Sequence, residues 1–205
     1  YQSKATGFQS FAMGFQTEAN GNRSVAMGEV NISDGDYSFS IGSYNQASGD
    51  YSVAMGEENN YTGSAYVNSG TASVAMGMRN QATGNYSVAM GNGTSASGDY
   101  AFTMGDSTEA SGNYSIAMGN RAKASDSTSI AIGQDVISSN SSIAIGLDNT
   151  TSGTYSIGIG ANADATAPYA TALGRNAQAT HQGSTAIGYN TDATATNASA
   201  FGTQK

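Results

Sequence analysis

Few residues of this chain could carry catalytic chemistry. The 205-residue sequence has a single histidine, His181, and no cysteine, so it offers no disulfide, thiolate nucleophile or thiolate zinc site. Serine is abundant but recurs at one repeated position, so no serine stands apart as a nucleophile beside a base. Glu57 and Glu58 are the nearest approach to a carboxylate pair. We therefore predict a protein that is not an enzyme and binds no cofactor.

Acidic residues also recur beside glycines that are suited to turns. Asp36, Asp50 and Asp99 each lie in a Gly-Asp-Tyr phrase. The spacing differs from the nonapeptide calcium repeat, and Asp and Asn are ordinary turn residues. We predict no metal site. Two alternatives are left open, which are calcium at these turns and an ion on the symmetry axis of an oligomer.

Tyrosines at one repeated position are the residues best suited to binding. Each lies five residues before a recurrent glycine, and we expect their rings to stack into an interrupted row. A tyrosine ring gives a large contact area at small entropic cost, so the row could act as a binding strip. The preferred interpretation is a structural row that covers the turn edge. Its members are Tyr37, Tyr51, Tyr86, Tyr100, Tyr114, Tyr155 and Tyr169.

An internal repeat must position these side chains. The phrase Ser-Val-Ala-Met-Gly at 24–28 recurs at 52–56 and 87–91, and Ser-Ile-Ala-Ile-Gly occurs at 129–133 and 142–146. Eleven of the thirteen intervals between the closing glycines are 14 residues long, one is 13 and one is 21. A disordered low-complexity chain would not keep this register. The closing glycines are at positions 14, 28, 42, 56, 77, 91, 105, 119, 133, 146, 160, 174, 188 and 202.

Bulky and small residues alternate within each repeat. The position before the closing glycine holds Met, Ile or Leu in nearly every copy, and seven of the eight methionines occupy it. Two residues earlier the chain places Val, Ile or Phe in the first eleven copies. Alternation with a period of two is typical of strands, and no segment has apolar residues at helical spacing. We predict an all-β chain with essentially no helix.

The period of 14 predicts a two-sheeted parallel β-roll. A second glycine often lies seven residues before the closing one, which divides each coil into two short sides joined by turns. Fourteen stacked coils would make a rod of about 65 Å. We expect the Val/Ile and Met/Ile rows to face the interior of the roll. Because so thin a rod would leave small and apolar groups in water, we also expect homo-oligomerisation with cyclic symmetry.

The 21-residue interval indicates an insertion near residues 57–70. Seven extra residues cannot complete a coil, so we expect an outward loop that carries Glu57, Glu58, Tyr61 and Tyr66. Insertions in solenoids map to one face and often serve binding. A tolerated surface loop without a function is the alternative.

These phrases, together with Ala-Ser-Gly or Ala-Thr-Gly seven residues before the closing glycine, resemble the YadA-like head repeats of trimeric autotransporter adhesins. The resemblance covers about residues 5–202. It implies a left-handed roll, a homotrimer, and a position at the cell surface outside the outer membrane of a Gram-negative bacterium. We therefore expect residues 1–205 to form a head of about fourteen repeats, with no stalk and no membrane anchor.

The expected function is multivalent adhesion without catalysis. By resemblance, the partners are host matrix proteins, cell-surface ligands or further copies of the head. The formal charge of −8 works against nucleic-acid binding, and no apolar run is long enough to cross a bilayer. The alternatives are an ice- or lattice-binding solenoid, a fibre enzyme that cleaves glycans, and a passive spacer. The candidate contact residues are Tyr37, Tyr51, Tyr86, Tyr100, Tyr114, Glu57, Glu58, Tyr61 and Tyr66.

Overall fold

The structure, a computed structural model, describes residues 2–59 and 69–203. The chain divides into two compact units, residues 1–107 (unit 1) and 108–205 (unit 2). All regular structure in the described ranges is β-strand, as the alternation predicts. Within those ranges there is accordingly no helix with the length and apolarity needed to cross a membrane.

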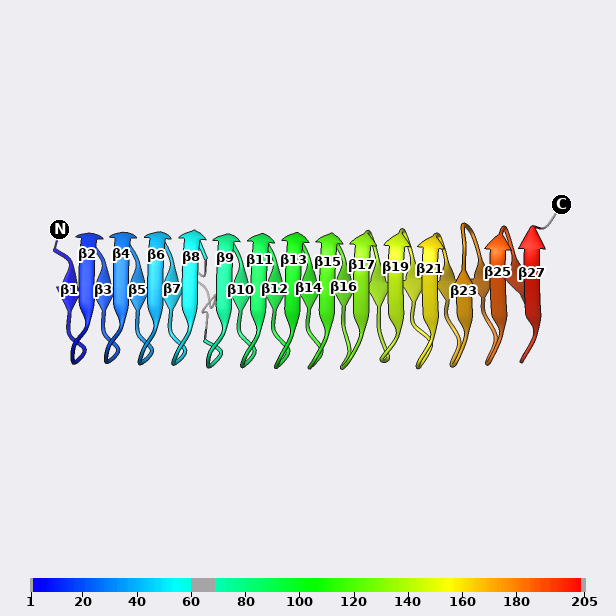
Figure 1. Cartoon of the computed structure of the whole chain (residues 1–205), viewed down its shortest axis with the longest axis horizontal. Helices are drawn as coiled ribbons and strands as arrows, with labels where there is room; N and C mark the ends of the chain where they lie inside the picture. The colour runs from blue at the N-terminus through cyan, green and yellow to red at the C-terminus, as the bar shows by residue number, and fades with distance from the viewer. Residues whose placement is uncertain (1, 60–68, 204–205) are drawn as a thin grey trace. The chain divides into compact units, whose positions relative to one another are not determined.

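Unit 1 is a stack of coils that each contribute a long strand (Figure 1). A short strand of two residues precedes most of the long strands. The long strands are β2 (Phe11–Phe15), β4 (Val25–Glu29), β6 (Phe39–Ser43), β8 (Val53–Glu57), β9 (Val74–Met78), β11 (Val88–Asn92) and β13 (Phe102–Asp106). The short strands are β1 (Lys4–Ala5), β3 (Glu18–Ala19), β5 (Ile32–Ser33), β7 (Gln46–Ala47), β10 (Gln81–Ala82) and β12 (Ser95–Ala96).

Unit 2 repeats the same design. Its long strands are β15 (Ile116–Asn120), β17 (Ile130–Gln134), β19 (Ile143–Leu147), β21 (Ile157–Ala161), β23 (Thr171–Leu173), β25 (Thr185–Tyr189) and β27 (Ser199–Thr203). Its short strands are β14 (Glu109–Ala110), β16 (Lys123–Ala124), β18 (Ile137–Ser138), β20 (Thr150–Thr151), β22 (Asp164–Ala165), β24 (Gln178–Ala179) and β26 (Asp192–Ala193).

Within each unit, equivalent strands of successive coils pair in parallel and in register. Met76 on β9, for example, pairs with Met90 on β11, and the closing glycines Gly77 and Gly91 pair beside them. The short strands form their own ladders, as in the pair Gln81 and Ser95. This register confirms the expected parallel β-solenoid with coils of about 14 residues.

The interior of the roll is filled by small residues. Ala26, Ala54 and Ala89, each the second residue of a long strand, are fully buried. The inward residues of the short strands, such as Ala19 and Ala96, lie on the other side of the same interior and are also fully buried. The core is therefore a narrow layer of mainly Ala, Ser, Thr and Asn, with Val136 as its largest fully buried side chain.

The expectation that the Val/Ile and Met/Ile rows fill the roll is wrong. Val25 and Met27 flank the buried Ala26 and remain half-exposed, so the bulky rows point outward. The reason is the short distance between the two sides of a coil. A Cβ added to Gly158 would lie 2.3 Å from Oγ1 of Thr151 and 2.6 Å from the carbonyl oxygen of Ala163, so the larger Thr151 is matched by a residue without a side chain.

The closing glycines are required by the backbone. Gly56 has a φ of +119°, and a Cβ there would lie 2.0 Å from the carbonyl oxygen of Gly77 in the next coil. Side chains are excluded both by the conformation and by the contact. The serine that opens several of the phrases has a different role. The Ser73 hydroxyl, for example, donates to the carbonyl oxygen of Gly70, at 2.7 Å, and closes the half-way turn.

The 13-residue interval is one residue shorter than the others, and the missing residue falls in a turn. The strand ladders therefore keep their register. Ser138 still pairs with Thr151, and Ile130 still pairs with Ile143. Asn140 and Ser141 adopt positive φ in the shortened turn. The deletion therefore interrupts the row of turn side chains and leaves both strand ladders intact.

Candidate functional site

The tyrosine row lies at the corner of each coil that precedes the long strand. Tyr37 and Tyr51 stack with ring centroids 4.9 Å apart and planes 4° from parallel. Tyr86 and Tyr100 stack in the same way at 5.0 Å, and the Tyr155–Tyr169 pair in unit 2 lies at 6.0 Å. The expected stacking is thus confirmed for these three pairs. The seven rings of the row are all exposed at their edges, with 43% to 62% of each residue accessible.

Tyrosine is an unfavourable residue for this corner. Tyr37 and Tyr86 have φ angles of 57° and 58°, in the left-handed region. This conformation costs most residues with a Cβ about 1 kcal/mol, whereas Gly has no Cβ and the short amide side chain of Asn can hydrogen-bond locally. Gly183 and Asn197 do occupy the equivalent corner in unit 2. Backbone preference therefore does not account for the tyrosines, and ring stacking between neighbouring coils is the observed interaction that can offset the strain.

Asp and Asn side chains next to the tyrosines link successive coils. The backbone N–H of Asn22 donates to Oδ1 of Asp36 at 2.8 Å, and the N–H of Asp36 donates to Oδ1 of Asp50 at 2.9 Å. Asn85 and Asp99 repeat the contact at 2.8 Å. These oxygens accept backbone hydrogen bonds along the stack, which gives the Gly-Asp-Tyr phrase a structural role. No cluster of three His, Asp or Glu residues suited to a metal ion occurs in the described part of the chain.

Arg23 lies at one end of the first tyrosine pair. Its guanidinium is 5.2 Å from the ring centroid of Tyr37 and also donates to the Tyr37 hydroxyl. Its Nε donates to Oε1 of Gln9 in the preceding coil at 3.0 Å. Arg23 thus extends the row by one coil with a planar cation stacked on an aromatic ring.

The insertion leaves the long strands undisturbed. β8 pairs directly with β9, Val53 opposite Val74 and Gly56 opposite Gly77 (Figure 1). Glu57 ends β8, and Glu58 occupies the left-handed corner that follows, so both belong to the coil itself. The expected loop is therefore shorter than 57–70, and Tyr61 and Tyr66 lie outside the described residues.

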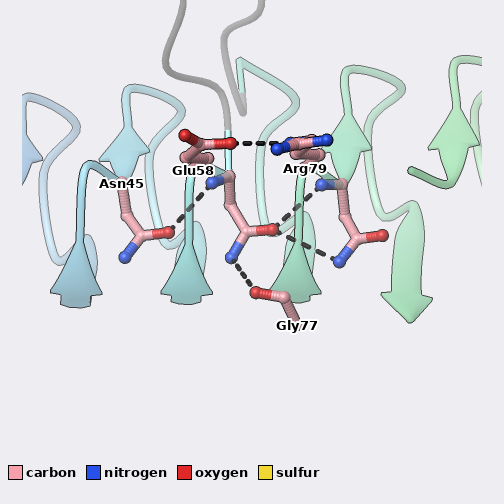
Figure 2. Close-up of polar contacts among 6 residues, drawn as sticks. Asn45, Glu58, Gly77 and Arg79 are labelled. Atoms are coloured by element: carbon pink, nitrogen blue, oxygen red, sulfur yellow. Dashed lines mark hydrogen bonds and ion pairs between the residues drawn. The ribbon is translucent and has the colours of Figure 1, made fainter. Parts of the chain in front are cut away.

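Glu58 is paired across the insertion. Its Oε2 accepts a hydrogen bond from Nε of Arg79 at 2.6 Å, as Figure 2 shows. This hydrogen bond, together with the carboxylate charge, raises the pKa of Arg79. The Glu58 carboxylate is consequently engaged within the chain, while Glu57 remains exposed beside it.

A buried asparagine row lies next to this ion pair in unit 1 (Figure 2). Oδ1 of Asn45 accepts the backbone N–H of Asn59 at 3.1 Å, and Oδ1 of Asn59 accepts the backbone N–H of Asn80 at 2.9 Å. Nδ2 of Asn59 donates to the carbonyl oxygens of Met55 and Gly77, at 2.7 and 3.0 Å. This row was not predicted from the sequence, although each member lies three residues after a closing glycine. The members are Asn31, Asn45, Asn59 and Asn80, and Asn149 repeats the position in unit 2.

On each unit, the outward residues of the long strands form a continuous apolar surface, which we call the apolar face. Phe11 and Met13 in unit 1 are 50% and 51% exposed, and most other members are half-buried. In unit 1 the face consists of Phe11, Val25, Phe39, Val53, Val74, Val88 and Phe102 with Met13, Met27, Ile41, Met55, Met76, Met90 and Met104. In unit 2 its central part consists of Ile116, Ile130, Ile143 and Ile157 with Met118, Ile132, Ile145 and Ile159.

The outward residues of the short strands form a polar face instead. Glu18 and Gln46 lie there in unit 1, and Lys123 of unit 2 pairs with Glu109 at 2.9 Å. Ile32 and Ile137 are exceptions on the polar face, but in most coils the two sides differ in polarity. Among the described residues, the large apolar surface of the kind that marks an interface lies on the side made by the long strands.

A charged pair occupies the corner after the long strand in unit 2. Nε of Arg121 donates to Oδ1 of Asp135 at 2.5 Å, and its Nη2 donates to Oδ2 at 2.6 Å. This bidentate hydrogen bonding lowers the pKa of Asp135. Both side chains are solvent-accessible, so the pair contributes little to stability and marks the outer edge of the roll.

The residues considered for other functions are dispersed. His181 is exposed at a half-way turn, where its Nδ1 lies 3.1 Å from the hydroxyl of Thr180. Thr171 and Thr185 are neighbours on the outer side of β23 and β25, but Thr191 is buried inside the roll. The threonines therefore do not form one flat row of the kind that an ice-binding solenoid needs.

The fold defines the class of protein, which is a parallel β-solenoid of two-sided coils. A family model for the YadA head domain repeat then matches at residues 5–28, 33–57, 69–94, 82–108, 110–135, 138–163, 165–191 and 182–204. The chain therefore belongs to the family of YadA head domain repeats, which confirms the resemblance seen in the sequence. This membership implies an adhesin-like role at a cell surface, of the trimeric autotransporter type. No curated protein matches the chain.

Proposed function

We propose that residues 1–205 form the non-catalytic adhesive head of a bacterial surface fibre. In this proposal the roll is left-handed, three chains associate side by side, and the head lies outside the outer membrane of a Gram-negative bacterium. Family membership supports the adhesive role. The single observation that carries the assembly is the apolar face, because the bulky rows point out of the roll.

The apolar face is where partner chains pack in this proposal. Val88 and Met90 point outward from β11, and the interior behind them is already filled by Ala89. The chain itself leaves no room to bury these side chains, because the inner layer is already filled. A second copy of the same regular face provides matching ridges, and closed cyclic symmetry covers the face on every chain.

The tyrosine row is the proposed contact strip for ligands. Its stacked rings have exposed edges, and the corner position favours residues other than tyrosine. Three copies of the strip on one head would multiply weak contacts into avidity. The proposed ligands are host matrix proteins, with cell-surface ligands and neighbouring heads as further partners of the same strip.

Asparagine replacements test the strip without disturbing the corner. The fourfold variant Tyr37→Asn, Tyr51→Asn, Tyr86→Asn and Tyr100→Asn keeps the fold, because Asn accepts positive φ and Asn197 occupies the equivalent corner. We expect binding to immobilised collagen, fibronectin or laminin to fall by about tenfold or more, since stacked aromatic contacts contribute jointly. The variant Tyr44→Asn is the matched control, because Tyr44 has a φ of 56° at the opposite corner.

The outcomes separate the candidate functions. Equal loss in the Tyr44→Asn control would show that the effect is general and not due to the strip. Full binding by the fourfold variant would refute the strip as the contact site. Absence of binding by the unmodified head to every immobilised ligand would favour the passive spacer.

A further inference from the structure

The methionines of this chain are concentrated in one row of the apolar face, the methionine row. In unit 1 this row holds methionine in six of its seven coils, and Ile41 is the exception. In unit 2 only Met118 belongs to it, and Ile132, Ile145 and Ile159 occupy the following positions. The eighth methionine, Met78, lies outside the row at the end of β9. The row comprises Met13, Met27, Met55, Met76, Met90, Met104 and Met118.

Packing does not explain why this row is methionine. Ile41 pairs with Met27 on one side and with Met55 on the other, so isoleucine fits the same ladder. The β-branched side chain is also the better strand former. Unit 2 shows that a nearly methionine-free row supports the same coil. What methionine adds is a thioether that an oxidant can convert to a sulfoxide.

We propose that the methionine row is an oxidation-sensitive contact, and that its conversion to sulfoxide separates the associated chains while each chain stays folded. The oxidant is a peroxide. One peroxide oxygen is transferred to the thioether sulfur, the O–O bond breaks, the sulfur loses two electrons, and the peroxide is reduced to water. The inference rests on the proposed function, because it requires the apolar face to be the contact between chains.

Geometry explains why association is lost before the fold. The sulfur atoms lie on the outside of the roll, and Met13 and Met104 are 51% and 40% exposed in the single chain. A sulfoxide oxygen in the contact would need a hydrogen-bond donor, but its neighbours in the face are Val, Phe, Ile and Met. The backbone N–H groups of the long strands are engaged in the parallel ladders. Burial of an unpartnered polar oxygen opposes association, whereas the Ala and Ser interior is untouched.

In the test, the full chain is oxidised with hydrogen peroxide in denaturant, and the peroxide and the denaturant are then removed. Mass is measured by light scattering and strand content by circular dichroism. A mock-treated sample regains the mass of the assembly. We expect the oxidised sample to regain its β spectrum while its assembled fraction falls about tenfold or more. A variant with all seven residues of the row changed to Ile keeps its assembly after the same treatment. The variant Met78→Ile remains sensitive.

A second measurement needs no variant. After partial oxidation, peptide mapping of the assembled and single-chain fractions should find sulfoxides of the row enriched in the single chains. Met78 sulfoxide should be equal in both fractions. Complete oxidation of the row with unchanged mass, or loss of the β spectrum together with the assembly, would overturn the inference and leave the proposed trimer standing. A mock-treated sample that is itself a single chain would refute the proposed assembly instead.

Discussion

Asn59 shows how a single side chain holds neighbouring coils together. Its amide accepts from the backbone of Asn80 and donates to the carbonyl oxygens of Met55 and Gly77. These partners lie on both sides of the insertion, so the amide links the coils that the insertion separates along the chain. A polar side chain at this depth stabilises only because every one of its groups has a partner.

The variant Asn59→Ala should lower the free energy of unfolding by about 2–3 kcal/mol, because it leaves backbone N–H and C=O groups buried without partners. The measurement is urea denaturation at a fixed protein concentration, since assembly couples to stability. Asn92→Ala is the control at an exposed site, with an expected change of about 0.5 kcal/mol or less. Equal losses in the two variants would contradict the role assigned to the buried row.

A second residue-scale prediction concerns pH. The pKa of Asp135 is lowered by hydrogen bonds from Arg121, so the stabilisation from this pair is present above the ordinary carboxyl pKa and lost as the pH falls through the lowered value. Arg121→Gln should return the pKa of Asp135 toward its ordinary range, as followed by NMR titration. Lys123→Gln, which breaks the neighbouring pair with Glu109, should leave the pKa of Asp135 unchanged.

At the scale of the element, the closing glycine fixes the distance between successive long strands. We predict that Gly56→Ala lowers the free energy of unfolding by more than about 3 kcal/mol, because the added Cβ meets the next backbone at a forbidden φ. Gly93→Ala should cost only about 1 kcal/mol, since its φ of +63° is accessible to Ala and the nearest atom to a Cβ is 3.9 Å away. Thermal unfolding of both variants provides the comparison, and similar midpoints would contradict this reading.

The sequence predicts the elements better than their orientation. The spacing of the closing glycines predicts the coils, their parallel register and the position of the tyrosine row. The alternation of Val25, Ala26 and Met27 defines two faces of a strand but does not say which is inner. That choice depends on the distance between the two sides of a coil, a tertiary quantity visible only in contacts such as that between Gly158 and Thr151. The asparagine row was visible in the sequence as Asn three residues after Gly42 and Gly56, but its burial was not.

At the scale of the whole molecule, the two faces of the coil should respond differently to an added charge. Val88→Glu places a charge in the apolar face, and we expect it to convert the assembly into single chains that keep their β spectrum, because a buried unpaired carboxylate opposes association. Gln81→Glu adds the same charge to the polar face and should leave the mass unchanged. Both masses come from sedimentation velocity. If Gln81→Glu dissociated the assembly, the contact between chains would involve the polar face, which would contradict the proposal.

The outward orientation of the bulky rows makes association the central claim. Its most direct test is sedimentation equilibrium of the intact chain over a wide range of concentrations. The account predicts a mass of three chains that persists on dilution and a β spectrum without helical signal. A stable, well-folded single chain at all concentrations would contradict it.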